Sequence, residues 1–319
     1  MKIVITPQHF DPKVVDLLCN AGHEVVPFIG KIGTASSEEE VYEIVKDADI
    51  IIAALENYTE SLLRRLPNLK LISRCGIGYD AIDVSALKKL GIGLTRATGF
   101  VEGAVAEHVL AYILYFAKML HVQSASMHAH EWKPFLPPGA KGRTLGLVGF
   151  GGIGKEIALR AKPFGMNILY YCRHPNPEDE AKYGAKSVTL EELLQKSDYV
   201  SLNVPLTDET HHLFDKSMIS KMKKGSYLIN IARGPVVDEV ALAESLLSGH
   251  LAGAGIDVFE KEPTVDSPLM DCPTAVLTPH TASLTLENYA EMNRAAAENV
   301  LNYLAGTIED KCVVTLGNR

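Results

Sequence analysis

Apolar residues along this chain recur with two spacings, which predict strands and helices in alternation. Over the first hundred residues, short β-branched runs alternate with segments whose apolar positions repeat at helical spacing. The runs that predict strands are 2–6, 24–28, 49–54, 69–73 and 92–95. The segments that predict helices are 11–20, 38–45 and 84–90. Gly22 stands just past the first helix, where glycine commonly ends a helix. Such alternation predicts a parallel sheet covered on both faces.

A long helical pattern from about 101 to 127 interrupts this alternation, and a proline-rich loop follows it. Further strands are predicted at 144–148, 167–171, 199–203, 226–231, 253–257 and 275–277. A last helix, 286–304, is long enough to leave the second α/β unit and pack elsewhere. We therefore predict a discontinuous first domain made of 1–100 and a returning segment, 285–319, with a second domain, 101–284, inserted between them.

The segment TLGLVGFGGIGKEIALRA places the pattern G-x-G-x-x-G between an apolar run and an amphipathic stretch. Gly149 lets the turn close, Gly151 lets the backbone approach a pyrophosphate, and Gly154 lets helix and strand pack closely. The helix N-terminus, where Gly152 and Ile153 lie, offers unpaired N–H groups and the positive end of the helix dipole to the phosphates. The second domain is therefore predicted to bind a dinucleotide in the Rossmann manner.

The end of the next predicted strand bears on which dinucleotide is bound. Sites that prefer NAD carry an acidic residue there, which binds the ribose hydroxyls. Here that position is Cys172, and Arg173 and His174 follow it. No carboxylate in this place repels a 2′-phosphate, and a guanidinium one residue on can pair with it. NADP(H) is the predicted cofactor, and NAD(H), with Arg173 as a surface residue, stays as the alternative.

The composition is typical of a globular enzyme with two domains. The chain has 319 residues, 47% of them hydrophobic and 22% charged. A net charge of −8 without a basic cluster argues against nucleic acid as a partner. The first strand begins directly after Met1, and the most apolar long stretch, 104–120, contains Glu107, His108 and Lys118. We therefore expect no signal peptide and no membrane partner.

The cysteines are odd in number and have no C-x-x-C spacing. This pattern predicts reduced thiols, a cytoplasmic location and no metal site. The five residues are Cys19, Cys75, Cys172, Cys272 and Cys312.

Three segments place reactive side chains just past predicted strands, where open α/β sheets bind their ligands. These side chains are Arg233, Glu262 (with Asp257 before it) and His280. The Glu262 carboxylate would favour the imidazolium form of His280, which could then donate a proton to a carbonyl oxygen as hydride reaches the carbon. Arg233 would bind a substrate carboxylate. Taken singly, these residues also fit a structural histidine, a surface arginine and a solvated carboxylate.

These segments resemble the D-isomer-specific 2-hydroxyacid dehydrogenases, in which an Arg after a strand, a Glu in DVFExEP and a His in TPH form the catalytic triad. The likeness extends to RCGIGYDAID (74–83), VAEH (105–108) and VPLTDET (204–210). It implies an α/β fold of two doubly wound parallel-sheet domains, a Rossmann domain inserted into a flavodoxin-like substrate domain. Thr98 and Val101 depart from the Pro and Asn of many members, which bears on substrate choice.

The resemblance also implies site residues. Backbone N–H groups of Ile77 and Gly78 would hold the substrate carboxylate, and Asp257 would take the nicotinamide carboxamide. Arg74 would meet a substrate phosphate or, as an equal alternative, cap backbone carbonyls. The remaining residues expected around the dinucleotide are Val204, Pro205, Thr210, Ile231 and Ala232.

The substrate stays open within the family. The Cys172–His174 segment is similar to that of NADP-type glyoxylate and hydroxypyruvate reductases, so a small 2-oxo acid is the expected substrate. A short phosphoglycerate dehydrogenase that uses NAD is the alternative, and a dinucleotide-sensing corepressor is a remote one. The predicted helix from 101 to 127 is apolar on more than one face, so it needs burial on several sides. The resemblance implies that this burial lies between the two copies of a homodimer.

Overall fold

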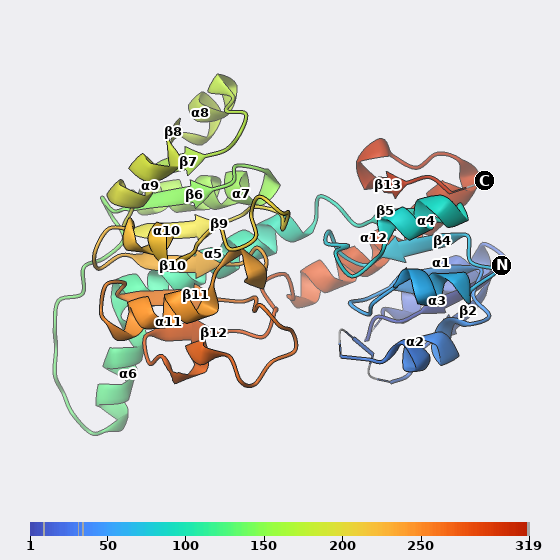
Figure 1. The fold of residues 1–319 in the computed structure, drawn as a ribbon, viewed down its shortest axis with the longest axis horizontal. Coiled ribbons are helices and arrows are strands. Elements are labelled where there is room, and N and C mark those ends of the chain that lie inside the picture. Colours follow the sequence, from blue (N-terminus) through green and yellow to red (C-terminus); the bar gives the residue numbers. More distant parts are fainter. Residues whose placement is uncertain (9, 31, 34, 318–319) are drawn as a thin grey trace. The chain divides into compact units, whose positions relative to one another are not determined.

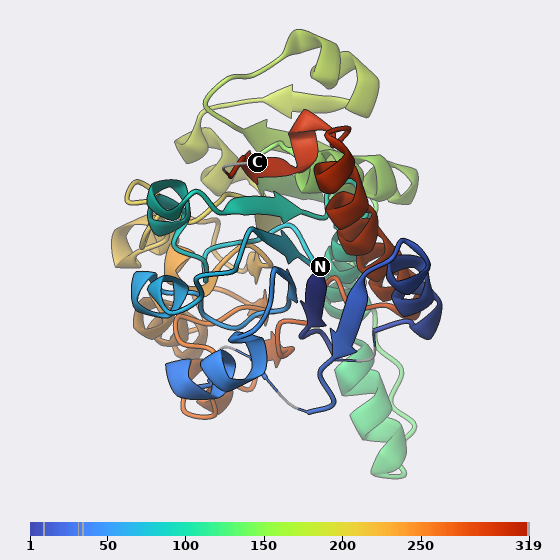
Figure 2. The ribbon, with the colours of Figure 1, turned by 90° about the vertical axis from the view of Figure 1, so that its right-hand side faces the viewer.

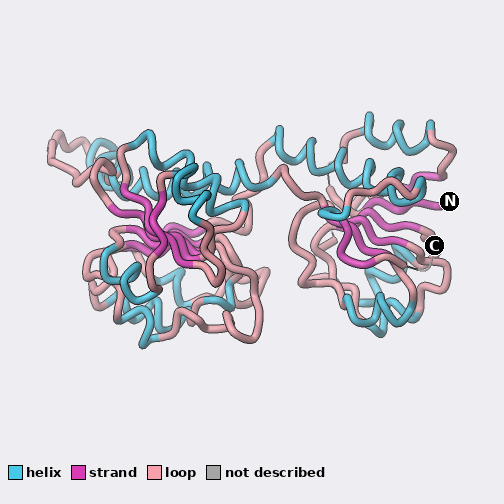
Figure 3. The backbone as a smooth tube through the Cα atoms, turned by 90° about the horizontal axis from the view of Figure 1, so that it is seen from above, coloured by secondary structure: helices cyan, strands magenta, loops and turns pink. Residues whose placement is uncertain are grey.

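The computed structural model describes residues 1–317 except 9, 31 and 34 (Figure 1). The chain forms two compact units. The first comprises Met1–Val101 and Leu284–Arg319, and the second comprises Glu102–Ser283. The ends of these units differ by one residue from the ranges expected from the sequence. In each unit the sheet lies between helices (Figure 3).

The sheet of the first unit has the strand order β13-β5-β4-β3-β1-β2. Its strands are β1 (Lys2–Ile5), β2 (Glu24–Pro27), β3 (Ile50–Ala53), β4 (Leu71–Arg74), β5 (Gly93–Arg96) and β13 (Val313–Thr315). The first five strands are parallel, in the order 2-1-3-4-5 of flavodoxin-like folds. The parallel sheet predicted from the first hundred residues is confirmed, and a strand that the sequence did not predict, β13, pairs antiparallel with β5 at one edge (Figure 2). No alternating pattern marks β13, which is only three residues long.

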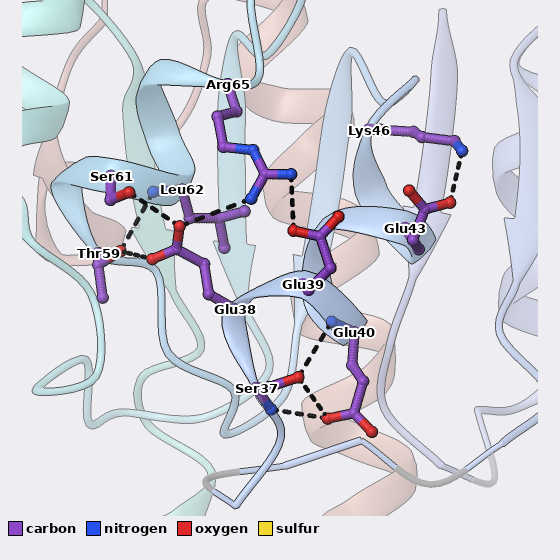
Figure 4. Close-up of polar contacts among 10 residues, drawn as sticks. All are labelled: Ser37, Glu38, Glu39, Glu40, Glu43, Lys46, Thr59, Ser61, Leu62 and Arg65. Carbon is purple, nitrogen blue, oxygen red and sulfur yellow. Dashed lines mark hydrogen bonds and ion pairs between the residues drawn. The ribbon is translucent and has the colours of Figure 1, made fainter.

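Helices cover both faces of this first sheet. They are α1 (Pro12–Asn20), α2 (Glu38–Val45), α3 (Glu60–Arg64), α4 (Val84–Leu90) and α12 (Leu286–Ala305). The last helix packs here, as its length predicted, and Ser73 of β4 donates a hydrogen bond to the Ala296 carbonyl of α12 at 2.8 Å. A capping box between Ser37 and Glu40 begins α2, and the Glu38 carboxylate accepts a hydrogen bond from Thr59 that ties α2 to α3 (Figure 4).

The second unit holds a parallel sheet in the order β12-β11-β10-β9-β6-β7-β8. Its strands are β6 (Thr144–Val148), β7 (Asn167–Tyr171), β8 (Ala185–Ser187), β9 (Tyr199–Leu202), β10 (Tyr227–Asn230), β11 (Gly253–Ile256) and β12 (Ala275–Leu277). Counted from β6, this is the Rossmann order 3-2-1-4-5-6 with a seventh strand beside the sixth. The sequence did not predict β8, because its three residues, AKS, form no apolar run. The predicted fold class is confirmed.

The helices of the second unit surround this sheet. They are α5 (Val101–Lys118), α6 (Leu120–His128), α7 (Gly152–Ala161), α8 (Pro177–Tyr183), α9 (Leu190–Lys196), α10 (Lys216–Ser220) and α11 (Glu239–Leu247). The expectation of one long helix over 101–127 is wrong. Met119 takes a left-handed backbone conformation, with φ of 48°, and α5 and α6 meet there at 59°. Among the described residues no single helix is long and apolar enough to cross a membrane.

Candidate active site

The glycine turn between β6 and α7 has the shape that a dinucleotide requires. Gly149 has φ of 96°, and a Cβ there would lie 2.6 Å from the Asn203 carbonyl oxygen. A Cβ on Gly154 would lie 2.6 Å from the Gly149 oxygen, so this glycine allows helix and turn to pack closely. A Cβ on Gly151 would meet nothing within 4 Å. The turn is therefore closely packed at Gly149 and Gly154, and there is open space at Gly151, where a pyrophosphate would lie.

The start of α7 adds the electrostatic part of this fit. Gly151 is the N-cap residue, and no side chain caps the helix there. The N–H groups of the first turn, which includes Gly152 and Ile153, therefore face outward with the positive end of the helix dipole. Such a helix terminus binds phosphate. The residues present thus fit a dinucleotide. Gly149 and Gly154 make the close backbone approaches that the motif predicted, and the contact of Gly151 with a pyrophosphate stays a prediction.

The segment after β7 carries the residues expected to select the cofactor. Cys172 is half-buried, whereas Arg173 and His174 are exposed. Arg173 Nη1 lies 3.3 Å from Glu209 Oε2, and both side chains are more than 70% exposed. Sequence reasoning missed Glu209, which comes from the loop after β9. The acidic side chain near this site therefore pairs with Arg173 and does not stand at the strand end.

The loop after β9 lies beside the glycine turn. Val204 Cγ1 would be 3.1 Å from a Cβ on Gly149, which places Val204 at the wall of the turn. Thr210 Oγ1 donates to the Pro205 carbonyl at 2.6 Å and holds this loop closed. Ile231 and Ala232 are buried at the end of β10. The roles of these residues toward a dinucleotide stay predictions.

His280 and Glu262 form a close pair in the second unit. His280 Nδ1 lies 2.6 Å from Glu262 Oε2. The other oxygen of Glu262 accepts a hydrogen bond from the Phe259 backbone N–H at 2.9 Å. Burial raises the pKa of Glu262, but the hydrogen bond and the charge of His280 outweigh it, so the pKa lies below its ordinary value. Glu262 is therefore an ionised carboxylate that orients the ring.

Asp257 organises the loop that carries His280. Its buried carboxylate accepts hydrogen bonds from the Thr278 hydroxyl at 2.5 Å and from the backbone N–H groups of Thr281 and Ala282 at 2.8 and 2.9 Å. Its carbonyl accepts from the His280 N–H at 2.8 Å. His280 has φ of 54°, an uncommon conformation for a residue other than glycine. Asp257 thus stabilises a strained backbone at the predicted acid–base residue, and its role toward nicotinamide stays a prediction.

A second histidine approaches the same loop. His108 Nε2 lies 3.1 Å from Thr278 Oγ1, and Tyr112 OH lies 2.6 Å from the same oxygen. Burial lowers the pKa of His108, although the Asp257 charge opposes this effect. His108 is therefore neutral near pH 7.

Arg233 stands at the end of β10, where the sequence placed it. Its Nη1 donates to the Ala232 carbonyl at 2.6 Å. The next residue, Gly234, is in close contact with the loop that leads to Glu262, because a Cβ there would lie 1.8 Å from the Phe259 backbone. Only glycine therefore fits at 234, and this contact brings Arg233 and Glu262 to the same edge of the sheet.

Two further glutamates, which sequence reasoning missed, tie this edge together. The Glu260 N–H donates to Glu239 Oε1 at 2.6 Å, and the Glu239 N–H donates to Glu260 Oε1 at 3.0 Å. The buried Glu239 also accepts from the Ser267 hydroxyl at 2.5 Å, and His212 Nε2 lies 3.1 Å from Glu260 Oε1. These reciprocal bonds join the start of α11 to the loop that carries Glu262.

The residues expected to bind substrate in the first unit follow β4. Arg74 is only 9% exposed, and its Nη1 donates to the Cys75 carbonyl. Gly76 has φ of 141°, and a Cβ there would lie 2.8 Å from Arg74 Nη1. Arg74 thus supports the turn that precedes Ile77 and Gly78, which are half-buried. Their contact with a substrate carboxylate stays a prediction.

The two departures from the family pattern also lie in this unit. Thr98 Oγ1 lies 3.5 Å from Cys312 Sγ, and Val101 is buried against the core beside α12. Both side chains therefore have structural neighbours. Their effect on substrate choice stays a prediction.

Fold and site together define an oxidoreductase that uses a nicotinamide dinucleotide. Residues 110–282 match the family model described as D-isomer specific 2-hydroxyacid dehydrogenase, NAD binding domain. The chain belongs to this family, which confirms the resemblance seen in the sequence.

Named relatives agree with this assignment. A glyoxylate reductase from Thermococcus litoralis is 40% identical over 281 residues, 85% of each chain. A glyoxylate/hydroxypyruvate reductase B from Citrobacter koseri is 38% identical over 86% of this chain and 87% of its own. Among solved structures, the TT0316 protein from Thermus thermophilus has a TM-score of 0.89 at 35% identity and covers 99% of this chain and 100% of its own.

Proposed function

We propose that this protein reduces small 2-oxo acids, such as glyoxylate and hydroxypyruvate, to D-2-hydroxy acids and uses NADP(H). The observation that carries the proposal is the 2.6 Å contact between His280 Nδ1 and Glu262 Oε2 at a strand-end edge. The names of the relatives support the substrate class. Cys172 in place of an acidic residue, with Arg173 after it, supports NADP(H) over NAD(H).

The roles of the side chains follow from their contacts. The bound dinucleotide supplies the hydride that adds to the carbonyl carbon. Glu262 holds Nδ1 of His280, so Nε2 is the atom that donates a proton to the carbonyl oxygen. In the opposite direction Nε2 accepts this proton from the hydroxyl group. Arg233 supplies positive charge for the substrate carboxylate and for the charge that develops on the oxygen.

The experiment is a panel of 2-oxo acids assayed with NADPH and with NADH, followed by loss of the reduced nicotinamide absorbance. We expect reduction of glyoxylate and hydroxypyruvate, with a higher kcat/KM when NADPH is the donor. His280→Ala serves as the inactive control, and its binding of NADPH is measured separately. Absence of reduction with every acid and both donors would refute the proposed activity, and preference for NADH would refute only the cofactor choice.

We further propose that the protein is a cytoplasmic homodimer. All five cysteines are free thiols, as expected in a reducing compartment. None of the residues of α6 is buried, and beyond it Trp132 and Leu136 are 83% and 97% exposed. A short helix that buries none of its residues is unstable in water, so a second copy covering α6 accounts for it. Light scattering at micromolar concentration should give a dimer and Val122→Glu a monomer, whereas a monomeric wild type would contradict the proposal.

A further inference from the structure

Arg96, the last residue of β5, carries a guanidinium that has no ion-pair or hydrogen-bond partner among the residues that the structure describes. The side chain is half-buried, and its Nε is shielded from solvent. The charge lies over the ring of Tyr79, whose centroid is 5.7 Å from Cζ. A buried donor without an acceptor is costly and rare in native proteins. Because Nε itself is closed to solvent, an acceptor that the protein does not supply would reach the terminal Nη groups of this guanidinium.

The position of Arg96 in the sheet makes the charge more unusual. Arg96 is the register partner of Arg74 on the adjacent parallel strand. Register partners point to the same face of a sheet, and their Cα atoms are about 5 Å apart. Like charges in directly opposite positions destabilise a sheet. Two arginines at the carboxyl ends of neighbouring strands thus form a cationic edge, in the part of an open α/β sheet where ligands bind.

Hydrogen bonds fix this edge against the loop expected to hold the substrate carboxylate. The N–H of Ala97, the residue after Arg96, approaches the carbonyl oxygens of Arg74 and Gly76 at 3.2 and 3.1 Å. The Arg96 carbonyl accepts from Asn299 Nδ2 at 3.0 Å. Tyr79, which contacts the Arg96 guanidinium, follows Ile77 and Gly78 directly in the chain. Arg96 is therefore held beside this loop from two sides.

The buried acid Glu56 of this unit does not neutralise Arg96. Glu56 follows β3 and is 1% exposed. Its Oε1 accepts hydrogen bonds from Tyr58 OH at 2.8 Å and from the Ala54 N–H at 3.2 Å, and Thr6 donates to the same oxygen. Within the described part of the chain, neither Glu56 Oε2 nor Arg96 Nε has a hydrogen-bond partner, so the two groups do not meet.

We propose that Arg96 binds a second anionic group of the substrate, so that the preferred substrates are 2-oxo acids with a second carboxylate or a phosphate group. This inference rests on the proposed function. The first carboxylate is held at Ile77 and Gly78, and the second anionic group accepts hydrogen bonds from Arg96, with the Arg74 charge beside it. A guanidinium suits both kinds of anion, because its fork of N–H donors matches their paired oxygens.

The test compares kcat/KM for five acids with wild type, Arg96→Leu and Arg96→Lys. Glyoxylate and hydroxypyruvate carry one anionic group, oxaloacetate and 2-oxoglutarate carry two carboxylates, and 3-phosphohydroxypyruvate carries a phosphate. We expect wild type to prefer at least one dianionic acid. Arg96→Leu should lower kcat/KM for that acid by roughly 10- to 100-fold, the value of a hydrogen bond to a charged group, and leave the monoanionic acids nearly unchanged. Arg96→Lys should restore part of the loss.

Controls separate the possible failures. Arg64→Leu removes an exposed arginine of α3 that pairs with Glu60, and it should affect no substrate. If wild type reduces only monoanionic acids, the inference is overturned and the proposed function stays intact. This result does not depend on whether any variant folds. An equal loss for all acids in Arg96→Leu shows a structural role and overturns it as well. Failure to reduce any 2-oxo acid overturns the proposed function itself. If kcat/KM is higher for the two dicarboxylic acids, the second anionic group is a carboxylate, and if it is higher for 3-phosphohydroxypyruvate, the group is a phosphate.

Discussion

The pair of Arg173 and Glu209 allows the cofactor preference to be tested from both sides. Arg173→Ala removes the guanidinium proposed to bind the 2′-phosphate of NADPH. Glu209→Gln removes the carboxylate that lies 3.3 Å from this guanidinium and competes with the phosphate for it. NADH has no 2′-phosphate, so its affinity should change little in either variant. The two substitutions should therefore move the NADPH affinity in opposite directions.

The structure sets the size of each effect. A hydrogen bond to a charged group contributes about 1.5–3 kcal/mol. Arg173 is 71% exposed, so solvent screening favours the lower end, and binding must also give up the Glu209 pair. Exposed ion pairs contribute about 0.2–1 kcal/mol. The net gain is then roughly 0.5–2 kcal/mol, so Arg173→Ala should weaken NADPH by about 2- to 30-fold. Glu209→Gln should strengthen it by up to about 5-fold.

The assay is the dissociation constant of each cofactor, measured by fluorescence titration or calorimetry at two salt concentrations. Both effects should shrink at high salt, because the charges are exposed. Equal losses of NADPH and NADH affinity in Arg173→Ala would show that this residue only supports the loop. Unchanged NADPH affinity in Glu209→Gln would show that the ion pair does not compete with the cofactor.

Three further predictions concern the acid–base pair and its support. His280→Ala should lower kcat by roughly 100-fold or more, and its NADPH binding should be retained. Glu262→Gln should shift the pH above which reduction slows to a lower value, and pH–rate profiles of wild type and variant check this shift. Because folding lowers the pKa of Glu262, its carboxylate adds to the free energy of unfolding at pH values above its ordinary pKa of 4.5, and this contribution is lost as the pH falls. Stability should therefore fall less steeply with acid in Glu262→Gln than in wild type. Identical acid-unfolding curves would contradict this prediction. Glu260→Ala should misplace Glu262, and it should therefore lower kcat by roughly 10- to 100-fold and alter the pH–rate profile. Glu260→Gln should restore both kcat and the pH–rate profile. The control Glu244→Ala, at an exposed position of α11, should change neither kcat nor the profile.

Much of the fold could be predicted because its elements carry local signals. Most strands of both sheets are short apolar runs, such as Ile50–Ala53, and all four of those residues are buried. Two of the discrepancies show why the rest could not be predicted. Met119 takes a left-handed conformation directly after α5, and no glycine or proline at this position predicts the end of the helix. β13 is a short edge strand that exists only because β5 offers it an unpaired edge.

The candidate catalytic residues could be picked out in the sequence because strand ends and short motifs place them. Arg233, Glu262 and His280 each follow a strand of one parallel sheet, and parallel strands end at a common edge. The residues missed in the sequence are those whose role lies in a contact. Glu260 looks like any loop carboxylate until its reciprocal bonds with Glu239 are seen.

Arg96 shows most clearly what a sequence does not contain. An arginine at the end of a strand is usually a surface charge, and the sequence around it, GLTRATG, carries no further signal. Its significance depends on three facts that exist only in the folded chain: the register that sets it beside Arg74, the burial of its Nε, and the absence of an acceptor for it among the described residues. A missing partner can be recognised only when all neighbours are known. Substrate specificity, which depends on such incomplete contacts, is therefore less predictable from sequence than the reaction, which depends on residues with fixed partners.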